Sequence, residues 1–145
     1  MVRYLNYNTV LKSEFSERVQ KISINAGFTC PNRDGSKGTG GCTYCNNQTF
    51  SPDYCKPAKS VSQQLEEGIA FFNHKYEAQK YLAYFQSYTN TYDKLENLTQ
   101  IYEEALNNPK VVGIVIGTRP DCVSDELLDY FAELNKRYYV MIEFT

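Results

Sequence analysis

Residues 111–117 read Val111-Val-Gly-Ile-Val-Ile-Gly117, an apolar run without a charged or hydrogen-bonding side chain. A strand with one exposed face alternates apolar and polar residues, whereas a parallel strand covered on both faces is apolar throughout. The run therefore predicts a buried strand inside a parallel sheet. Asn107-Asn-Pro109 ends the helical pattern before it, and Thr118 to Asp121 forms a turn after it.

Helical and strand patterns alternate on both sides of this run. Three more short segments are typical of strands: residues 21–25, 81–86 and 138–144. Three helices are expected after residues that can cap a helix N-terminus: Ser60-Val-Ser-Gln63, which fits a capping box, Asp93 and Ser124. Strands that alternate with helices predict an α/β fold, with parallel strands joined by right-handed crossovers.

Unusual polar residues follow three of the expected strands. They occur in the glycine- and cysteine-rich loop of residues 28–59, in residues 86–92 and in residues 118–121. The carboxyl ends of parallel strands meet at one edge of a sheet, where ligands bind in barrels and in open α/β sheets alike. We therefore expect these three loops to converge on a single site.

The last expected strand, residues 138–144, has no helix after it. An uncovered strand leaves an unpaired sheet edge and an exposed apolar flank. We therefore expect the chain to be the first part of a longer protein.

The composition is that of a soluble globular chain. Of 145 residues, 42% are hydrophobic and 22% are charged. No apolar run reaches the roughly 18 residues that a membrane helix needs, and the N-terminal residues lack the apolar segment of a signal peptide. A cytoplasmic location without membrane contact is expected. The net charge of −2 gives no support to nucleic-acid binding, which usually relies on basic residues.

Three of the five cysteines lie together in the long loop, with the spacing Cys30-x11-Cys42-x2-Cys45. The odd count argues against a disulfide framework, and the single histidine, His74, gives little support to a zinc finger. Thiolates are ligands for iron–sulfur clusters, zinc and copper(I). A cubane cluster usually has four thiolate ligands, so three would leave one iron open to an amine and a carboxylate. The alternative is a zinc site with Cys55 as the fourth ligand.

Residues 25–47 read Asn25-Ala-Gly-Phe-Thr-Cys-Pro-Asn-Arg-Asp-Gly-Ser-Lys-Gly-Thr-Gly-Gly-Cys-Thr-Tyr-Cys-Asn-Asn47 and resemble the cluster loop of radical SAM enzymes. They are most similar to a poorly characterised bacterial family with an elongator-catalytic-subunit-like radical SAM domain. Residues 81–92 and Thr118-Arg-Pro-Asp-Cys122 share this resemblance. It implies that residues 1–145 are the N-terminal part of a radical SAM domain. That part would be the first half of a partial (β/α)6 barrel of the triosephosphate-isomerase type.

The resemblance also implies the cofactors and their contacts. Cys30, Cys42 and Cys45 would hold a 4Fe-4S cluster that reductively cleaves S-adenosylmethionine (SAM) to a 5′-deoxyadenosyl radical. Tyr44 would lie near the adenine. Gln86 and Ser87 stand where many relatives have a Gly-Gly-Glu stretch that receives the methionine amino group. Glu143 matches a position near the cofactor, although Phe144-Thr145 departs from the Leu-Gly-Leu-Gln continuation of similar proteins.

Arg119 has two interpretations from its chemistry. Its planar guanidinium can pair with a surface carboxylate, or it can bind the carboxylate of the cofactor. We count it among the candidate cofactor-binding residues.

The substrate is expected to be transfer RNA, because similar domains act on it, with a small metabolite or a protein as further substrate classes. An electron donor such as flavodoxin or ferredoxin would supply the reduction. The rival hypothesis is a zinc-stapled binding module without catalysis, held by Cys30, Cys42, Cys45 and Cys55.

Overall fold

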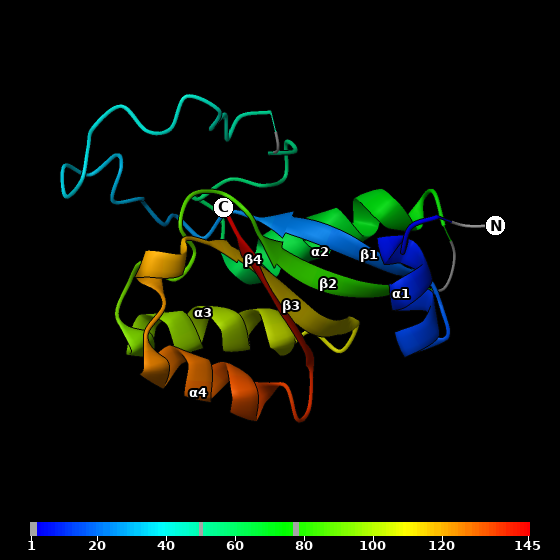
Figure 1. Cartoon of the computed structure of the whole chain (residues 1–145). Helices are drawn as coiled ribbons and strands as arrows, with labels where there is room; N and C mark the ends of the chain where they lie inside the picture. The colour runs from blue at the N-terminus through cyan, green and yellow to red at the C-terminus, as the bar shows by residue number, and fades with distance from the viewer. Residues whose placement is uncertain (1–2, 50, 77–78) are drawn as a thin grey trace.

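The computed structural model describes residues 3–49, 51–76 and 79–145, which form a four-stranded sheet with helices packed on it (Figure 1). In chain order the elements are α1 (Tyr7–Phe15), β1 (Val19–Ile24), α2 (Val61–Asn73), β2 (Lys80–Phe85), α3 (Leu95–Leu106), β3 (Val111–Thr118), the 3-10 turn η1 (Pro120–Cys122), α4 (Asp125–Leu134) and β4 (Tyr139–Phe144).

All four strands are parallel, and their order in the sheet, β1-β2-β3-β4, is the same as in the chain. One α-helix lies in each crossover: α2 between β1 and β2, α3 between β2 and β3, and α4 between β3 and β4. The expected α/β fold with parallel strands is confirmed.

β3 lies inside the sheet between β2 and β4, and Ile114, Val115 and Ile116 are all fully buried. Ile114 and Ile116 belong to the core beneath helices α2, α3 and α4, whereas Val115 lies in a second core beneath α1. Burial on both faces therefore explains why residues 111–117 are apolar throughout.

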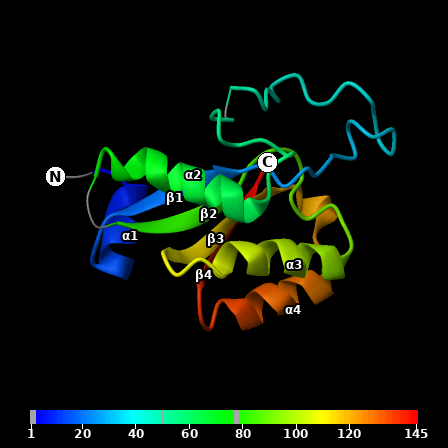
Figure 2. The ribbon, with the colours of Figure 1, turned by 180° about the vertical axis from the view of Figure 1, so that it is seen from behind.

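The two faces of the sheet have different covers. Helices α2, α3 and α4 pack on one face, where their apolar side chains meet every second residue of the strands; Figure 2 shows these helices in front of the sheet. Helix α1 packs on the opposite face, with Leu11 buried. We call this opposite face the α1 face. It comprises the side chains of Val19, Lys21, Leu82, Tyr84, Val115, Met141 and Glu143.

Two of the three expected helix caps are confirmed. Ser60 and Gln63 form the capping box of α2, and the Ser124 hydroxyl accepts a hydrogen bond from the Leu127 N–H at the start of α4. The prediction for α3 was wrong by one residue, because its N-cap is Lys94, without a side-chain cap. The Asp93 carboxylate instead accepts hydrogen bonds from the N–H of Lys94 and the side-chain amide of Asn97.

Sequence patterns did not predict α1. Asn6 caps this helix, because its side-chain oxygen accepts a hydrogen bond from the N–H of Asn8. Tyr7, Leu11 and Phe15 recur four residues apart and pack in the second core, with Leu11 buried. This short apolar stripe is a helical signal that the sequence analysis missed.

The long loop of residues 28–59 is largely as expected. Its described residues contain no helix or strand, and Phe50 lies outside the described residues. Among the residues that the structure describes, no helix combines the length and apolar character that a membrane span requires.

Candidate functional site

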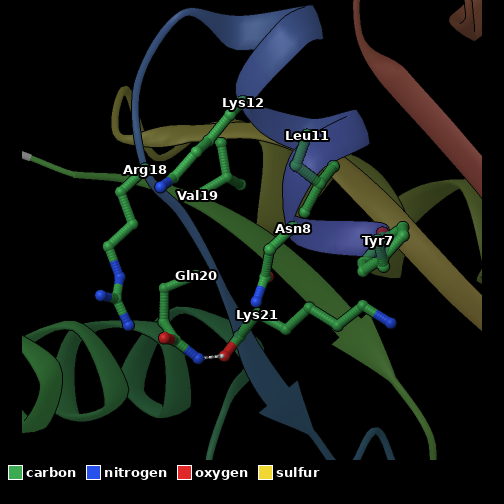
Figure 3. A pocket seen from close by; sticks show the side chains of 8 residues that line it. All are labelled: Tyr7, Asn8, Leu11, Lys12, Arg18, Val19, Gln20 and Lys21. Carbon is green, nitrogen blue, oxygen red and sulfur yellow. Dashed lines mark hydrogen bonds between the residues drawn. The ribbon is translucent and has the colours of Figure 1, made fainter. Parts of the chain in front are cut away.

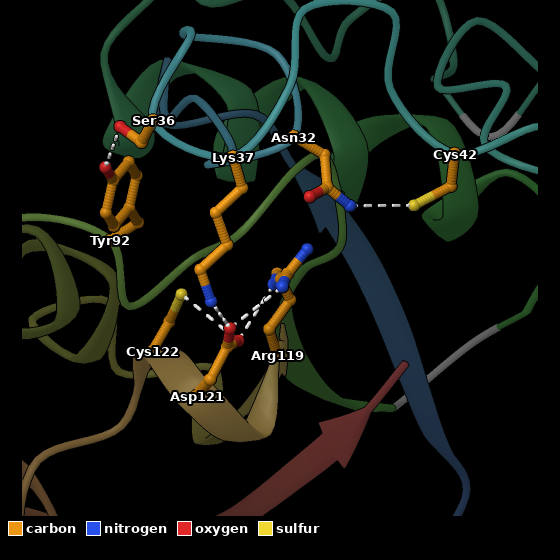
Figure 4. Close-up of polar contacts among 8 residues, drawn as sticks. All are labelled: Asn32, Ser36, Lys37, Cys42, Tyr92, Arg119, Asp121 and Cys122. Atoms are coloured by element: carbon orange, nitrogen blue, oxygen red, sulfur yellow. Dashed lines mark hydrogen bonds and ion pairs between the residues drawn. The ribbon is translucent and has the colours of Figure 1, made fainter.

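The loops that follow β1, β2 and β3 are joined at the carboxyl edge of the sheet. The N–H of Thr89 donates to the carbonyl of Thr29 at 3.2 Å, and the N–H of Asn90 donates to the carbonyl of Gly117 at 3.2 Å. Lys37 of the cysteine loop also pairs with Asp121 after β3 (Figure 4). The predicted convergence of the three loops is confirmed.

Gln64 of α2 holds the two ends of the cysteine loop, and sequence reasoning missed it. Its side chain is fully buried. The amide nitrogen donates to the carbonyls of Asn25 and Lys59 at 2.9 and 3.0 Å, and the amide oxygen accepts from the Asn25 N–H at 2.9 Å. One side chain thus ties the residues where the loop leaves β1 and approaches α2. Its polar type within the apolar pattern of α2 is the only sequence signal for this role.

Arg33 gives the inside of the loop its shape. Its guanidinium donates to the carbonyl of Cys45 at 3.2 Å and lies over the backbone of Gly41. A Cβ atom on residue 41 would lie 2.7 Å from Arg33 Cζ, and the φ angle of +75° at Gly41 also favours glycine. The two ends of the Cys30-to-Cys45 segment are therefore packed together by one cation.

The three loop cysteines are all partly exposed. The Cys42 thiol accepts a hydrogen bond from the Asn32 side-chain amide at 3.1 Å, as Figure 4 shows, and the Cys45 N–H donates to the Cys42 carbonyl at 3.0 Å. Among the described residues, no three Cys, His, Asp or Glu side chains form a group that could hold a metal ion. A metal shared by these thiols therefore requires the loop to close further.

The environment of Cys42 favours its thiolate form. Hydrogen bonds from Tyr44 and then Asn32 lower the pKa of Cys42, and the positive charges of Arg119 and Arg33 lower it further. Soft thiolates on one glycine-rich loop, with two guanidinium groups to offset their charge, fit the donor chemistry of an iron–sulfur cluster.

Cys55 has a different environment from the loop thiols. It is only 4% exposed and packs in the core with Tyr54, Val61 and Leu65. Burial raises the pKa of its thiol to about 11, so it is a poor candidate for a fourth metal ligand, which must lose its proton.

This difference predicts the order of thiol alkylation in metal-free protein. At pH 8 a thiol with a pKa of about 11 is ionised in about one molecule in a thousand, and only the thiolate reacts. Iodoacetamide should therefore modify Cys55 about a hundredfold more slowly than Cys42, as measured by peptide mass spectrometry over time. Equal rates for the two residues in folded protein would contradict the burial of Cys55.

A pocket of about 170 Å³ lies at the carboxyl edge beside the cysteine loop. Four of the residues proposed from the sequence line it together: Tyr44, Cys45, Gln86 and Glu143. This volume is below the roughly 300–1,000 Å³ typical of whole small-molecule sites, so the pocket can hold part of such a ligand.

Glu143 is held in position by two residues that the sequence analysis missed. Lys21 Nζ donates to Glu143 Oε1 at 2.8 Å, and the Tyr84 hydroxyl donates to Oε2 at 2.7 Å. These side chains come from β4, β1 and β2 and meet on the α1 face. Burial, and then the hydrogen bond to Glu143, raise the pKa of Tyr84, so the phenol stays protonated and donates.

Ser87 and Arg119 are not among the residues that line this pocket. Ser87 is buried. Both guanidinium contacts of Arg119 go to Asp121, at 2.8 Å from Nε to Oδ1 and 2.8 Å from Nη2 to Oδ2. Arg119, followed by Lys37, holds the pKa of Asp121 well below its usual range. A cofactor carboxylate at Arg119 would have to compete with Asp121, so the geometry favours the carboxylate-pairing interpretation.

The chain is similar to proteins from two bacteria and an archaeon. "Protein YhcC" of Escherichia coli (strain K12) is 40% identical over 129 residues, which are 89% of this chain and 40% of that protein. "Uncharacterized protein YtqA" of Bacillus subtilis (strain 168) is 39% identical over 141 residues, 97% of this chain and 44% of that protein. "Uncharacterized protein MJ0486" of Methanocaldococcus jannaschii is 32% identical over 139 residues, 94% of this chain and 41% of that protein.

The chain thus spans about two fifths of the length of these curated relatives. No family model matches it, and no solved structure matches it significantly.

Proposed function

We propose that this chain is part of a radical SAM enzyme whose Cys30, Cys42 and Cys45 bind a 4Fe-4S cluster. When bound, the cluster would supply the electron that cleaves SAM to a 5′-deoxyadenosyl radical. The observation that carries the proposal is the pocket at the carboxyl edge, because it is lined by Cys45, Tyr44, Gln86 and Glu143. These residues come from the cysteine loop, from the end of β2 and from β4. Binding of SAM beside the cluster would require them to meet in one pocket.

The arrangement of the sheet supports a barrel of the triosephosphate-isomerase type. A doubly wound sheet reverses its strand order at a switch point, whereas the order here is consecutive. Helices α2, α3 and α4 also share one face, as helices outside a barrel do. We therefore propose that these four strands are the first part of a (β/α)6 barrel with the α1 face inside.

The side chains around the pocket have separate roles in this proposal. The Glu143 carboxylate, fixed by Lys21 and Tyr84, would bind the amino group of the methionine end of SAM by a charge-assisted hydrogen bond. Tyr44, exposed at the pocket, would pack on the adenine. Arg33 and Arg119 would offset the negative charge of the three thiolates.

Transfer RNA is the substrate class that we propose, from the resemblance of the cysteine loop, with a reduced flavodoxin or ferredoxin as electron donor. The zinc-stapled module has less support, because its fourth ligand would be Cys55. That residue would have to leave the hydrophobic core and lose its proton against a pKa of about 11.

The test is SAM cleavage by the full chain. After anaerobic reconstitution with iron and sulfide and reduction by dithionite, we expect 5′-deoxyadenosine to form from SAM, as measured by liquid chromatography. The control without dithionite should form none. Glu143→Gln removes the charge that the SAM amino group would meet, so the KM for SAM should rise about tenfold, which corresponds to about 1.4 kcal/mol.

Two results would count against the proposal. The first is an intact cluster that yields no 5′-deoxyadenosine under reducing conditions. The second is stoichiometric zinc that iron cannot replace.

A further inference from the structure

A second and larger pocket, of about 440 Å³, lies between helix α1 and the edge strand β1 (Figure 3). Its volume is within the roughly 300–1,000 Å³ of small-molecule sites. The residues that line it are Tyr7, Asn8, Leu11, Lys12, Arg18, Val19, Gln20 and Lys21. It shares none of them with the pocket beside the cysteine loop.

The lining of this pocket is cationic. Of the described residues that line it, Lys12, Arg18 and Lys21 carry positive charge and none is acidic. Lys21 is neutralised by Glu143. None of the ion pairs formed among the described residues involves Lys12 or Arg18. The positive character of the pocket therefore comes from these two side chains.

The fold holds the pocket open and positions its polar groups. Leu11 and Val19 are buried and form an apolar floor between α1 and β1. The Arg18 guanidinium stacks on the ring of Tyr76 at 3.5 Å from its centroid, which restricts its position without cancelling its charge. Asn8 and Gln20 contribute side-chain amides to the same lining. Figure 3 shows Lys12 extending from α1 toward β1, and Arg18 and Gln20 beside β1.

We propose that this pocket binds a phosphate-bearing ligand. Two cations and two amides around one cavity match the charge and the hydrogen-bond acceptors of a phosphate group. The phosphate could belong to a free nucleotide or to the backbone of RNA, and the chemistry at the pocket is the same for both. Because no cysteine lines the pocket, this inference stands apart from the proposed cluster.

The pocket also has a physical link to the candidate SAM site. Lys21 lines the larger pocket, and its ammonium donates to Glu143, which lines the smaller one. A phosphate that attracts Lys21 would weaken this ion pair. A ligand in the larger pocket would thus change the charge that Glu143 presents to the smaller pocket beside the cysteine loop.

The test uses direct binding by the metal-free full chain, so it does not depend on SAM cleavage. The probes are pyrophosphate, adenosine monophosphate and a single-stranded oligoribonucleotide, measured by calorimetry at low and at moderate salt. We expect binding that weakens as salt increases. Lys12→Gln and Arg18→Gln should each raise the Kd about tenfold, whereas Lys12→Arg, which keeps the positive charge, should keep the Kd of the parent protein. Lys136→Gln, at an exposed position in the turn after α4, is the matched control and should leave the Kd unchanged.

The pattern of binding identifies the source of the phosphate. Binding of pyrophosphate and adenosine monophosphate supports a small phosphate ligand, and binding of the oligoribonucleotide alone, lost in the two Gln variants, supports the RNA backbone. The proposal is overturned if none of the three probes binds. It is also overturned if Lys12→Gln and Arg18→Gln, folded as judged by thermal unfolding, bind as tightly as the parent protein.

Discussion

Replacement of Cys30, Cys42 or Cys45 by Ala, one at a time, should abolish cluster binding in protein reconstituted anaerobically with iron and sulfide. A cubane held by three thiolates has no spare ligand in the loop, so each loss leaves two irons without a protein ligand. The parent protein should contain about four irons per chain and show the broad visible absorbance of an iron–sulfur cluster. Each variant should lose both signals, as measured by iron analysis and absorbance.

Cys55→Ser is the matched control for these three variants. Because Cys55 is buried in the core and its thiol has a raised pKa, the variant should retain the full iron content once it is folded. Its free energy of unfolding should fall by about 1–3 kcal/mol, since a hydroxyl replaces a buried thiol. Equal loss of iron in all four variants would contradict the three-cysteine cluster and support a four-thiolate site.

The closing of the cysteine loop gives these variants a second readout. Among the described residues, the thiols of the cysteine loop do not form a group that could hold a metal ion. Cluster binding must therefore reorganise the loop from Cys30 to Cys45. Gln64 holds the two ends of the cysteine loop through its hydrogen bonds to Asn25 and Lys59. These bonds limit the reorganisation to the interior of the loop. Metal binding that orders a segment adds to stability, so reconstitution should protect the backbone amides of this loop from hydrogen exchange.

Gly113→Ala should cause a large loss of stability. A Cβ atom on residue 113 would overlap the carbonyl oxygen of Tyr139 and lie 2.7 Å from the Tyr139 Cβ. These atoms belong to the neighbouring strand β4, so they move only if β4 moves. Overpacking against backbone should lower the free energy of unfolding by about 3 kcal/mol or more, as measured by urea denaturation.

Gly40→Ala is the matched control for that substitution. A Cβ atom on residue 40 would meet nothing within 4 Å, and the residue lies in the cysteine loop away from the sheet. Its free energy of unfolding should change by less than about 0.5 kcal/mol. If Gly113→Ala and Gly40→Ala were equally stable, β3 and β4 would not approach each other as closely as described.

Local patterns in the sequence were sufficient for most of the fold. The apolar run of residues 111–117 predicted a buried parallel strand, because burial on both faces leaves no position for a polar side chain. Ser60 and Ser124 marked the starts of α2 and α4, because a cap needs only a short-range hydrogen bond. The placement of polar loops after successive strands predicted their convergence, which follows from parallel strand direction alone.

The environment of individual side chains required the tertiary structure. The sequence presents Cys55 as one more cysteine near the loop, and only its packing in the core separates it from Cys42. Arg119 has two interpretations from the sequence, and only the geometry shows its guanidinium hydrogen-bonded to the Asp121 carboxylate. Helix α1 was missed although Tyr7, Leu11 and Phe15 are four residues apart, because a nine-residue helix with one fully buried residue gives only a short periodic pattern.

The sequence by itself thus determined the parallel α/β class, the placement of polar loops after successive strands and the spacing of the three thiols. Each of these depends on neighbours along the chain. The tertiary structure alone decided which distant groups meet. Lys21 and Glu143 are 122 positions apart, and they become partners because the pairing of β1 to β4 in one parallel sheet places both side chains on the α1 face. Strand register depends on the packing of the whole sheet, so no local pattern encodes that contact.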